Sequence, residues 1–251
     1  PFRDIAWGLA SRGIAVLRYE KRTKQHGQAL NPLPLPFTVN EESIDDAITA
    51  LAAVQKHKGI DPAKSYILGH SLGGMLIPRI SERAKQATGF IVLAGTTRPL
   101  EDVIIEQSSY LALLDGSTSV EEQKQLDAVQ LEVNRIKKLS ESDATNPALV
   151  FGAPASYWLD LRNYDPVAKA KQITKPVLIL QGERDYQVTM SDFNRWRDTF
   201  ENSATVTLKS YPDLNHLFAK GTGPGAPAEY ATPSHVSRQV IDDIAAWIGQ
   251  H

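Results

Sequence analysis

The residues best suited to chemistry lie at positions 69–73, which read Gly-His-Ser-Leu-Gly and match the pattern G-x-S-x-G. Tyr-Ile-Leu before this run is typical of a strand, and Gly-Met-Leu-Ile after it is typical of the start of a helix. A serine at such a turn presents its Oγ at the tip, and the flanking glycines allow the backbone segments to approach closely. The pattern therefore predicts Ser71 as a nucleophile. The alternative is a glycine-rich turn that holds a serine by chance.

A serine hydroxyl needs a histidine base, and that histidine needs a carboxylate partner. The chain contains six histidines. His216 lies in a turn after the last expected strand, which is where a parallel sheet places a catalytic base. His70 adjoins Ser71, so we expect its side chain to point away from that of the serine. The other four lie in a polar loop, at helix ends or at the terminus: His26, His57, His235 and His251.

The acid candidate is Asp185, which follows the apolar run of residues 177–180. Glu183 and Asp213 are local competitors for the same role. The order Ser71, Asp185, His216 is the chain order expected of α/β-hydrolases. The alternative, three unrelated loop residues, requires three independent placements at strand ends in that order.

Short apolar strands alternate with amphipathic helices along the chain, which predicts a mostly parallel sheet with helices on both faces. Asn40 is expected to cap the helix that follows it. We expect strands at residues 14–17, 65–68, 90–93, 177–180 and 206–211. We expect helices at residues 2–11, 72–85, 192–200 and 236–248, with a further helix after Asn40.

Residues 97–170 interrupt that alternation with two or three helices and no expected strand. Ser119 and Glu122 form a capping-box pattern at the start of one of them. We expect residues 1–96 and 171–251 to form the core. The 97–170 insertion is then a helical cap, or lid, over the carboxyl ends of the strands, where open α/β sheets bind ligands. The alternative is a packing element that extends the core.

Four stretches together resemble the α/β-hydrolase superfamily, and closely its bacterial serine carboxylesterases with a helical cap. They are residues 12–19, 69–74, 180–185 and 215–216. The resemblance implies Ser71 as nucleophile, Asp185 as acid, His216 as base and a helical cap. Residues 156–161 resemble segments that line the acyl pocket in related esterases, so Tyr157, Trp158 and also His70 are candidate pocket residues. The alternative for this segment is ordinary packing between cap and core.

An oxyanion hole needs two donors, and the backbone N–H of Leu72 is expected to be one. The resemblance places the second on a loop before the helix at residues 2–11, hence upstream of residue 1. The strand that feeds this helix would lie between the strands at residues 14–17 and 65–68. We count five strands where the family usually has eight. We therefore expect a longer polypeptide, and either an empty slot of about 10 Å in the sheet or a strand supplied from outside this numbering.

Composition excludes several other classes. The 251 residues are 42% hydrophobic and 22% charged, as in an ordinary soluble globular protein. A net charge of -2 without a dense basic run gives nucleic-acid binding little support. The absence of cysteine excludes disulfides, zinc-thiolate sites and a cysteine nucleophile. No apolar run reaches the roughly 18 residues of a membrane span, and no signal peptide is apparent. Cytoplasmic and secreted locations both stay open.

These features predict a serine carboxylesterase that cleaves small to medium acyl esters through an acyl-serine intermediate, with no metal ion or organic cofactor. The same triad also serves acyl thioesterases and peptidases, since pocket shape decides the leaving group. A third possibility is a non-catalytic protein of this fold that binds a small ligand. The sequence does not address the natural substrate or the oligomeric state.

Overall fold

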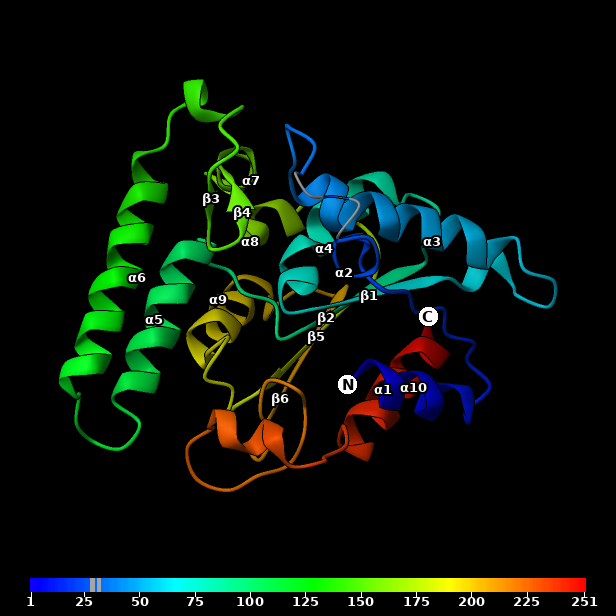
Figure 1. The fold of residues 1–251 in the computed structure, drawn as a ribbon. Helices are drawn as coiled ribbons and strands as arrows, with labels where there is room; N and C mark the ends of the chain where they lie inside the picture. The colour runs from blue at the N-terminus through cyan, green and yellow to red at the C-terminus, as the bar shows by residue number, and fades with distance from the viewer. Residues whose placement is uncertain (28–29, 31–32) are drawn as a thin grey trace. The chain divides into compact units, whose positions relative to one another are not determined.

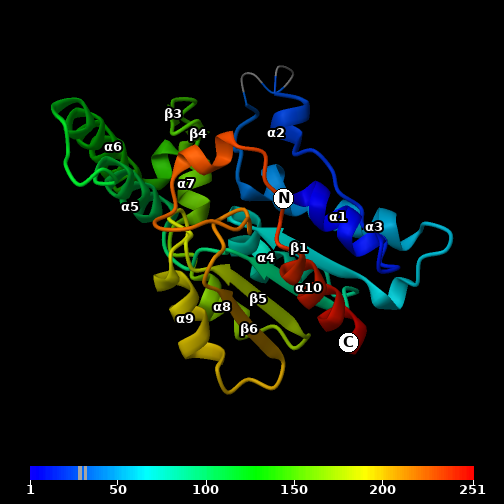
Figure 2. The same cartoon turned by 90° about the horizontal axis from the view of Figure 1, so that it is seen from below.

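The computed structural model describes residues 1–27, 30 and 33–251. Two compact units make up the chain. Unit 1 comprises residues 1–19, 47–97 and 166–251, and unit 2 comprises residues 20–46 and 98–165. Figures 1 and 2 show the elements of both units. Ser71, Asp185 and His216 all belong to unit 1.

A parallel sheet of four strands forms the centre of unit 1, in the order β1-β2-β5-β6. The strands are β1 (Tyr66–His70), β2 (Gly89–Leu93), β5 (Val177–Gly182) and β6 (Val206–Tyr211). Every residue of β2 and β5 is buried, as the continuous apolar runs predict. The expected parallel sheet is confirmed, and all four carboxyl ends lie at one edge.

Helices cover both faces of this sheet. On one face, α1 (Phe2–Ala10) packs beside α10 (Arg238–Gln250), as Figure 1 shows. Their apolar stripes, including Ile5 and Ile244, form one core cluster with Ile91 and Leu180 of the sheet. The remaining helices of unit 1 include α4 (Leu72–Arg83), α8 (Pro166–Ala170) and α9 (Met190–Phe200), with short turns at η2 (Pro62–Lys64) and η4 (Pro227–Ala231). The apolar spacing thus predicted the covering helices correctly.

The strand expected at residues 14–17 is wrong. These residues adopt no regular structure, and Val16 and Leu17 are 39% and 44% exposed. A strand needs a neighbour that accepts and donates its backbone hydrogen bonds, and none pairs with this segment among the described residues. Within the same residues, β1 pairs with β2 alone. The sheet therefore has four strands where we expected five. The gap that we expected between strands at residues 14–17 and 65–68 is not defined, because only the second of these two strands forms.

Unit 2 is mostly helical. Its two long helices, α5 (Leu100–Ala112) and α6 (Val120–Lys138), lie side by side as a hairpin in Figures 1 and 2. The predicted capping box at the start of α6 is confirmed: the Glu122 backbone N–H donates to Ser119 Oγ at 3.2 Å, and the Ser119 backbone N–H donates to Glu122 Oε2 at 2.8 Å. These bonds satisfy two backbone donors at the helix start.

The rest of unit 2 corrects the expectation of a strandless insertion. Two short strands, β3 (Leu149–Val150) and β4 (Ala153–Pro154), pair antiparallel. They are followed by α7 (Ala155–Leu161) and preceded by η3 (Glu141–Asp143). Such a two-residue ladder is too short to give a period-2 pattern in the sequence.

Residues 20–46 also belong to unit 2, with α2 (Arg22–Gln25) and the π-helical turn η1 (Asn40–Ile44), which continues into α3 (Asp45–Gln55). Ser156 joins the two stretches of unit 2, because its Oγ accepts from the Phe37 N–H at 3.0 Å and donates to the Phe37 carbonyl at 2.8 Å. No helix in the described part of the chain is long and apolar enough to cross a bilayer.

Candidate active site

Ser71 occupies a sharp turn between β1, which ends at His70, and α4, which begins at Leu72. Its backbone has φ 57° and ψ -121°, a conformation that residues other than glycine rarely adopt. Two backbone hydrogen bonds hold this geometry: Ser71 N–H donates to the Leu93 carbonyl at 2.9 Å, and the Ser71 carbonyl accepts from Met75 N–H at 2.9 Å. The strain is thus sustained by both the sheet and the helix, as expected of a nucleophile turn.

Two glycines make this turn possible through close packing. A Cβ on Gly69 would lie 2.2 Å from the Gly73 carbonyl oxygen, and one on Gly74 would lie 2.9 Å from the Gly95 Cα. Both distances are shorter than van der Waals contact, so a larger residue at either position displaces backbone atoms. The expectation of a close backbone approach around the serine is therefore confirmed.

The backbone N–H of Leu72 opens the first turn of α4, where no preceding helical carbonyl can accept it. The partial positive charge of a helix N-terminus adds to its ability to stabilise an anion. This position suits Leu72 to the role of oxyanion donor that the sequence assigns to it.

The structure brings Asp185 and His216 together. His216 Nδ1–H donates to Asp185 Oδ2 at 2.7 Å, and the two residues are each 4% exposed. Three further donors surround the Asp185 carboxylate. Its Oδ1 accepts from the backbone N–H groups of Gln187 at 2.8 Å and Val188 at 2.9 Å, while its Oδ2 also accepts from Gln181 Nε2 at 3.1 Å. These hydrogen bonds hold the carboxylate in one orientation.

The two competing acids lie elsewhere. Glu183 is exposed and accepts a hydrogen bond from Ser210 Oγ at 2.7 Å, and Asp213 is exposed as well. The four histidines other than His70 and His216 are also exposed. Burial and hydrogen bonding therefore single out the Asp185–His216 pair from the candidates that the sequence left open.

A hydrogen-bond network that the sequence analysis missed supports the His216 loop. Asn215 Oδ1 accepts from the backbone N–H groups of Leu217 at 3.0 Å and Ala219 at 3.1 Å. Asn215 Nδ2 donates to Glu229 Oε2 at 2.9 Å, and Glu229 is paired with Arg184. The hydrogen bond from Arg184 lowers the pKa of Glu229 against the opposing effect of burial. Residues 215–216 entered the sequence analysis only as part of the family resemblance, which did not indicate this network.

His70 faces His216 rather than open solvent. Its Nε2 lies 2.8 Å from the backbone carbonyl oxygen of His216, and the two ring centroids are 4.6 Å apart with planes tilted by 46°. Burial, and then the neighbouring His216, lower the pKa of His70 to about 3. His70 is therefore a neutral ring beside the candidate base, next in sequence to the candidate nucleophile.

Tyr157 and Trp158, the other two candidate pocket residues, lie on α7 in unit 2 and are 6% and 4% exposed. The Tyr157 hydroxyl donates to Glu42 Oε2 at 2.6 Å, and Trp158 Nε1–H donates to the Val150 carbonyl at 3.1 Å. Burial, and then the charge of Glu42, raise the pKa of Tyr157. Both polar atoms are thus satisfied within unit 2, and the role of these residues in an acyl pocket stays a prediction.

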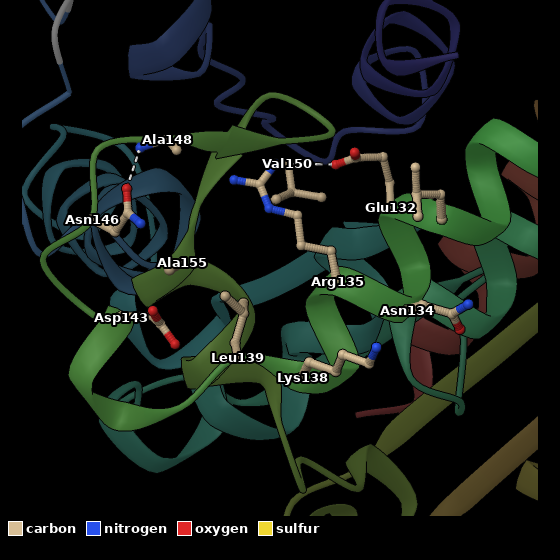
Figure 3. A pocket seen from close by; sticks show the side chains of 11 residues that line it. Glu132, Asn134, Arg135, Lys138, Leu139, Asp143, Asn146, Ala148, Val150 and Ala155 are labelled. Carbon is tan, nitrogen blue, oxygen red and sulfur yellow. Dashed lines mark hydrogen bonds and ion pairs between the residues drawn. The ribbon is translucent and has the colours of Figure 1, made fainter.

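Unit 2 also contains a separate pocket of about 480 Å³ between α6, the following loop and β3 (Figure 3). Arg135, which forms an ion pair with Glu132 at 3.5 Å, points across it from α6. The lining is Leu131, Glu132, Asn134, Arg135, Lys138, Leu139, Asp143, Asn146, Ala148, Val150 and Ala155. None of the candidate site residues lines this pocket.

The chain matches a known protein family. Residues 2–220 match the family model described as serine aminopeptidase, S33, a family of α/β-hydrolases. The chain belongs to this family. The matched stretch runs from α1 past His216, so it includes the nucleophile turn and both members of the buried pair.

Among characterised sequences, Esterase EstD of Thermotoga maritima is 42% identical to this chain over 247 residues. The alignment covers 98% of this chain and 56% of EstD, so the chain spans little more than half the length of that relative.

Among solved structures, Est1E from Butyrivibrio proteoclasticus superposes with a TM-score of 0.49 at 14% identity, covering 86% of this chain and 72% of Est1E. The monoacylglycerol lipase of Paleococcus ferrophilus superposes with a TM-score of 0.43 at 16% identity, covering 82% of this chain and 75% of the lipase.

Proposed function

We propose that this hydrolase is a serine carboxylesterase that cleaves esters of small to medium acyl chains, with Ser71, His216 and Asp185 as its catalytic triad. The buried Asp185–His216 pair carries the proposal, because a histidine held at 2.7 Å by a buried carboxylate is the group that a serine nucleophile needs. The identity of 42% to an esterase supports the choice of ester chemistry.

In the proposed mechanism, Asp185 fixes the proton of His216 on Nδ1. The Nε2 lone pair is then available to accept the Ser71 hydroxyl proton as Ser71 Oγ attacks the ester carbonyl. The carboxylate also stabilises the imidazolium that forms. Both residues are almost fully buried, so water does not weaken this charge interaction.

The attack produces a tetrahedral intermediate whose oxygen carries the negative charge. Leu72 N–H donates to this oxyanion. As the intermediate collapses, the bond between the carbonyl carbon and the alcohol oxygen breaks, and His216 Nε2–H protonates the departing alcohol. Water then attacks the acyl-serine with His216 again as base, and the acid is released as Ser71 regains its proton. No step of this proposal uses a metal ion or an organic cofactor.

Peptidase activity is the second candidate, because the description of the matching family names a serine aminopeptidase. The same triad serves both reactions, and pocket shape decides between them. The two candidates differ in the leaving group: an amine requires more complete protonation by His216 than an alcohol does.

A panel of substrates distinguishes these candidates. We expect p-nitrophenyl esters from acetate to octanoate to be hydrolysed with measurable kcat/KM, and amino-acid p-nitroanilides to be hydrolysed at least 100-fold more slowly. Ser71→Ala serves as the blank for each substrate, with circular dichroism as the check on folding. Faster cleavage of the anilides would replace the esterase proposal by the peptidase. Activity on neither substrate class in the folded protein would contradict both.

We further propose that residues 97–170 form a helical cap whose α7 side chains Tyr157 and Trp158 contribute to the acyl pocket. The insertion of α5, α6 and α7 between β2 and β5 in chain order supports this role. Trp158→Ala is then expected to lower kcat/KM for the octanoate ester more than for the acetate ester. An equal loss on both esters would show that Trp158 serves the packing of unit 2 alone.

A further inference from the structure

We propose that His70 is a positioning residue for the catalytic base, which anchors the backbone of His216 through a hydrogen bond from its own ring. The inference rests on the proposed triad, since it assigns His70 a role through His216. It makes the residue before the nucleophile a determinant of where the base lies, rather than a residue of the acyl pocket.

The hydrogen bond to the His216 carbonyl defines which nitrogen of the His70 ring carries the proton. Nε2 lies 2.8 Å from the His216 carbonyl oxygen, and a carbonyl can only accept. The proton of neutral His70 therefore lies on Nε2. This bond joins residues 146 positions apart in the sequence, and it ties the end of β1 to the loop after β6.

The surroundings of His70 leave it little freedom. Its ring meets the edges of Phe2, at a centroid distance of 5.8 Å, and Phe218, at 6.3 Å, while its tilted contact with the His216 ring measures 4.6 Å. Phe218 is fully buried, and its N–H donates to the Asn215 carbonyl at 2.8 Å. The His216 turn is thus held by its own backbone on one side and by His70 on the other.

The His70 ring, which holds the His216 backbone, has to be uncharged. Desolvation and the proximity of His216 lower the pKa of His70 to about 3, so the ring stays neutral at the pH at which an esterase of this kind works. A cation 4.6 Å from His216 would oppose the imidazolium that the reaction forms. Lysine and arginine could donate to the same carbonyl, but they would bring that charge. A neutral ring supplies the donor without it.

The position of His70 in the sequence explains how its hydrogen bond to the His216 carbonyl can affect catalysis. Because His70 immediately precedes Ser71, one strand end carries both the nucleophile and the group that holds the base. The separation of the two catalytic side chains therefore depends on this one hydrogen bond as well as on the sheet. Loss of the bond is expected to slow the chemical step more than substrate binding, since alignment of reacting groups acts on kcat.

A matched pair of variants tests the anchor. His70→Gln keeps an N–H donor at a similar reach, whereas His70→Met has nearly the same length and no donor. We expect His70→Met to lower kcat for a p-nitrophenyl ester about tenfold, the equivalent of one lost hydrogen bond, with KM changed by less than about twofold. His70→Gln should retain kcat within about threefold. Equal kcat values for the two variants, both folded by circular dichroism, would overturn the inference.

A measurement on the unaltered protein covers the case in which His70→Met does not fold. In protein labelled with ¹⁵N-histidine, the His70 signals, assigned by their loss in His70→Gln, should show a protonated Nε2 and an unprotonated Nδ1 from pH 5 to 8. An Nδ1–H tautomer, or a titration near pH 6.5, would contradict the anchor. Failure of the proposed function is distinct: wild-type protein that hydrolyses no ester refutes the triad. An active wild type with a His70→Met variant as active as His70→Gln refutes only the role of His70.

Discussion

Replacement of Asp185 by asparagine tests how the buried pair sets the protonation of the base. Oδ1 of Asp185 accepts from two backbone N–H groups, those of Gln187 and Val188. In Asp185→Asn, we expect the amide oxygen to take the place of Oδ1 and to accept from these two N–H groups, because the amide NH2 group cannot accept a hydrogen bond. The amide nitrogen then faces His216 Nδ1 and donates to it.

The expected consequence is a change of tautomer. His216 Nδ1 becomes an acceptor and the ring proton moves to Nε2, which is the atom that must take the Ser71 proton. A base in the wrong tautomer lowers kcat by about 10⁴-fold in triads of this kind, which corresponds to about 5 kcal/mol in activation free energy. The amide nitrogen no longer accepts from Gln181 Nε2, but Gln181 keeps the carbonyls of Gly182 and Val188 as acceptors. The loop should therefore keep its geometry, and KM should change little.

The assay is steady-state hydrolysis of a p-nitrophenyl ester at pH 7 to 8, with fold checked by circular dichroism. Asp213→Asn is the matched control, since Asp213 is an exposed acid on the same loop as His216. It should retain kcat within about threefold. A folded Asp185→Asn variant with more than a tenth of the wild-type kcat, or a larger loss in Asp213→Asn, would refute the assignment of the acid.

Three further predictions concern stability. Asp192 is fully buried and its Oδ1 accepts three hydrogen bonds from two neighbouring threonines at 2.7 to 2.9 Å; Asp192→Ala should lower the free energy of unfolding in urea by about 3 kcal/mol, and a loss below 1 kcal/mol would contradict this. Gly74→Ala should lower it by about 1–3 kcal/mol because its Cβ meets the Gly95 Cα at 2.9 Å, whereas Gly73→Ala, whose Cβ meets nothing within 4 Å, should not destabilise. Since His70 has a pKa of about 3 when folded and about 6.5 when unfolded, the unfolded state binds the extra proton between these values, so wild-type stability should fall as the pH drops below about 6.5. The free energy of unfolding of His70→Gln should lack that part of the pH dependence. Parallel pH profiles of stability for the wild type and His70→Gln would contradict this prediction.

Features that depend on neighbouring residues were predictable from the sequence. The nucleophile turn needs a strand, two close-packed glycines and a helix, all within residues 66–77, and the capping box of α6 needs only Ser119 and Glu122. The central strands β2 and β5 are continuous apolar runs because both of their faces are buried. In each of these cases the sequence pattern that indicates the feature lies in one short segment.

Features that depend on a distant partner were not predictable in this way. Residues 14–17 have an apolar pattern, but a strand forms only where another strand completes its hydrogen bonds. Residues 20–46 carry no signal that assigns them to unit 2, because the bonds between Phe37 and Ser156 join positions 119 apart. The network from Asn215 to Glu229 and the bond from His70 to the His216 carbonyl are likewise long-range contacts between polar groups without a local pattern.

Covalent labelling with a fluorophosphonate probe tests the central claim most directly, because the probe reacts only with a serine whose hydroxyl an adjacent base activates. We predict one phosphonyl group per chain, located on Ser71 by peptide mass spectrometry. Labelling should be absent in Ser71→Ala and should slow by orders of magnitude in His216→Gln. No labelling of the folded wild-type protein, or labelling at a serine other than Ser71, would contradict the assignment of this chain as a serine esterase.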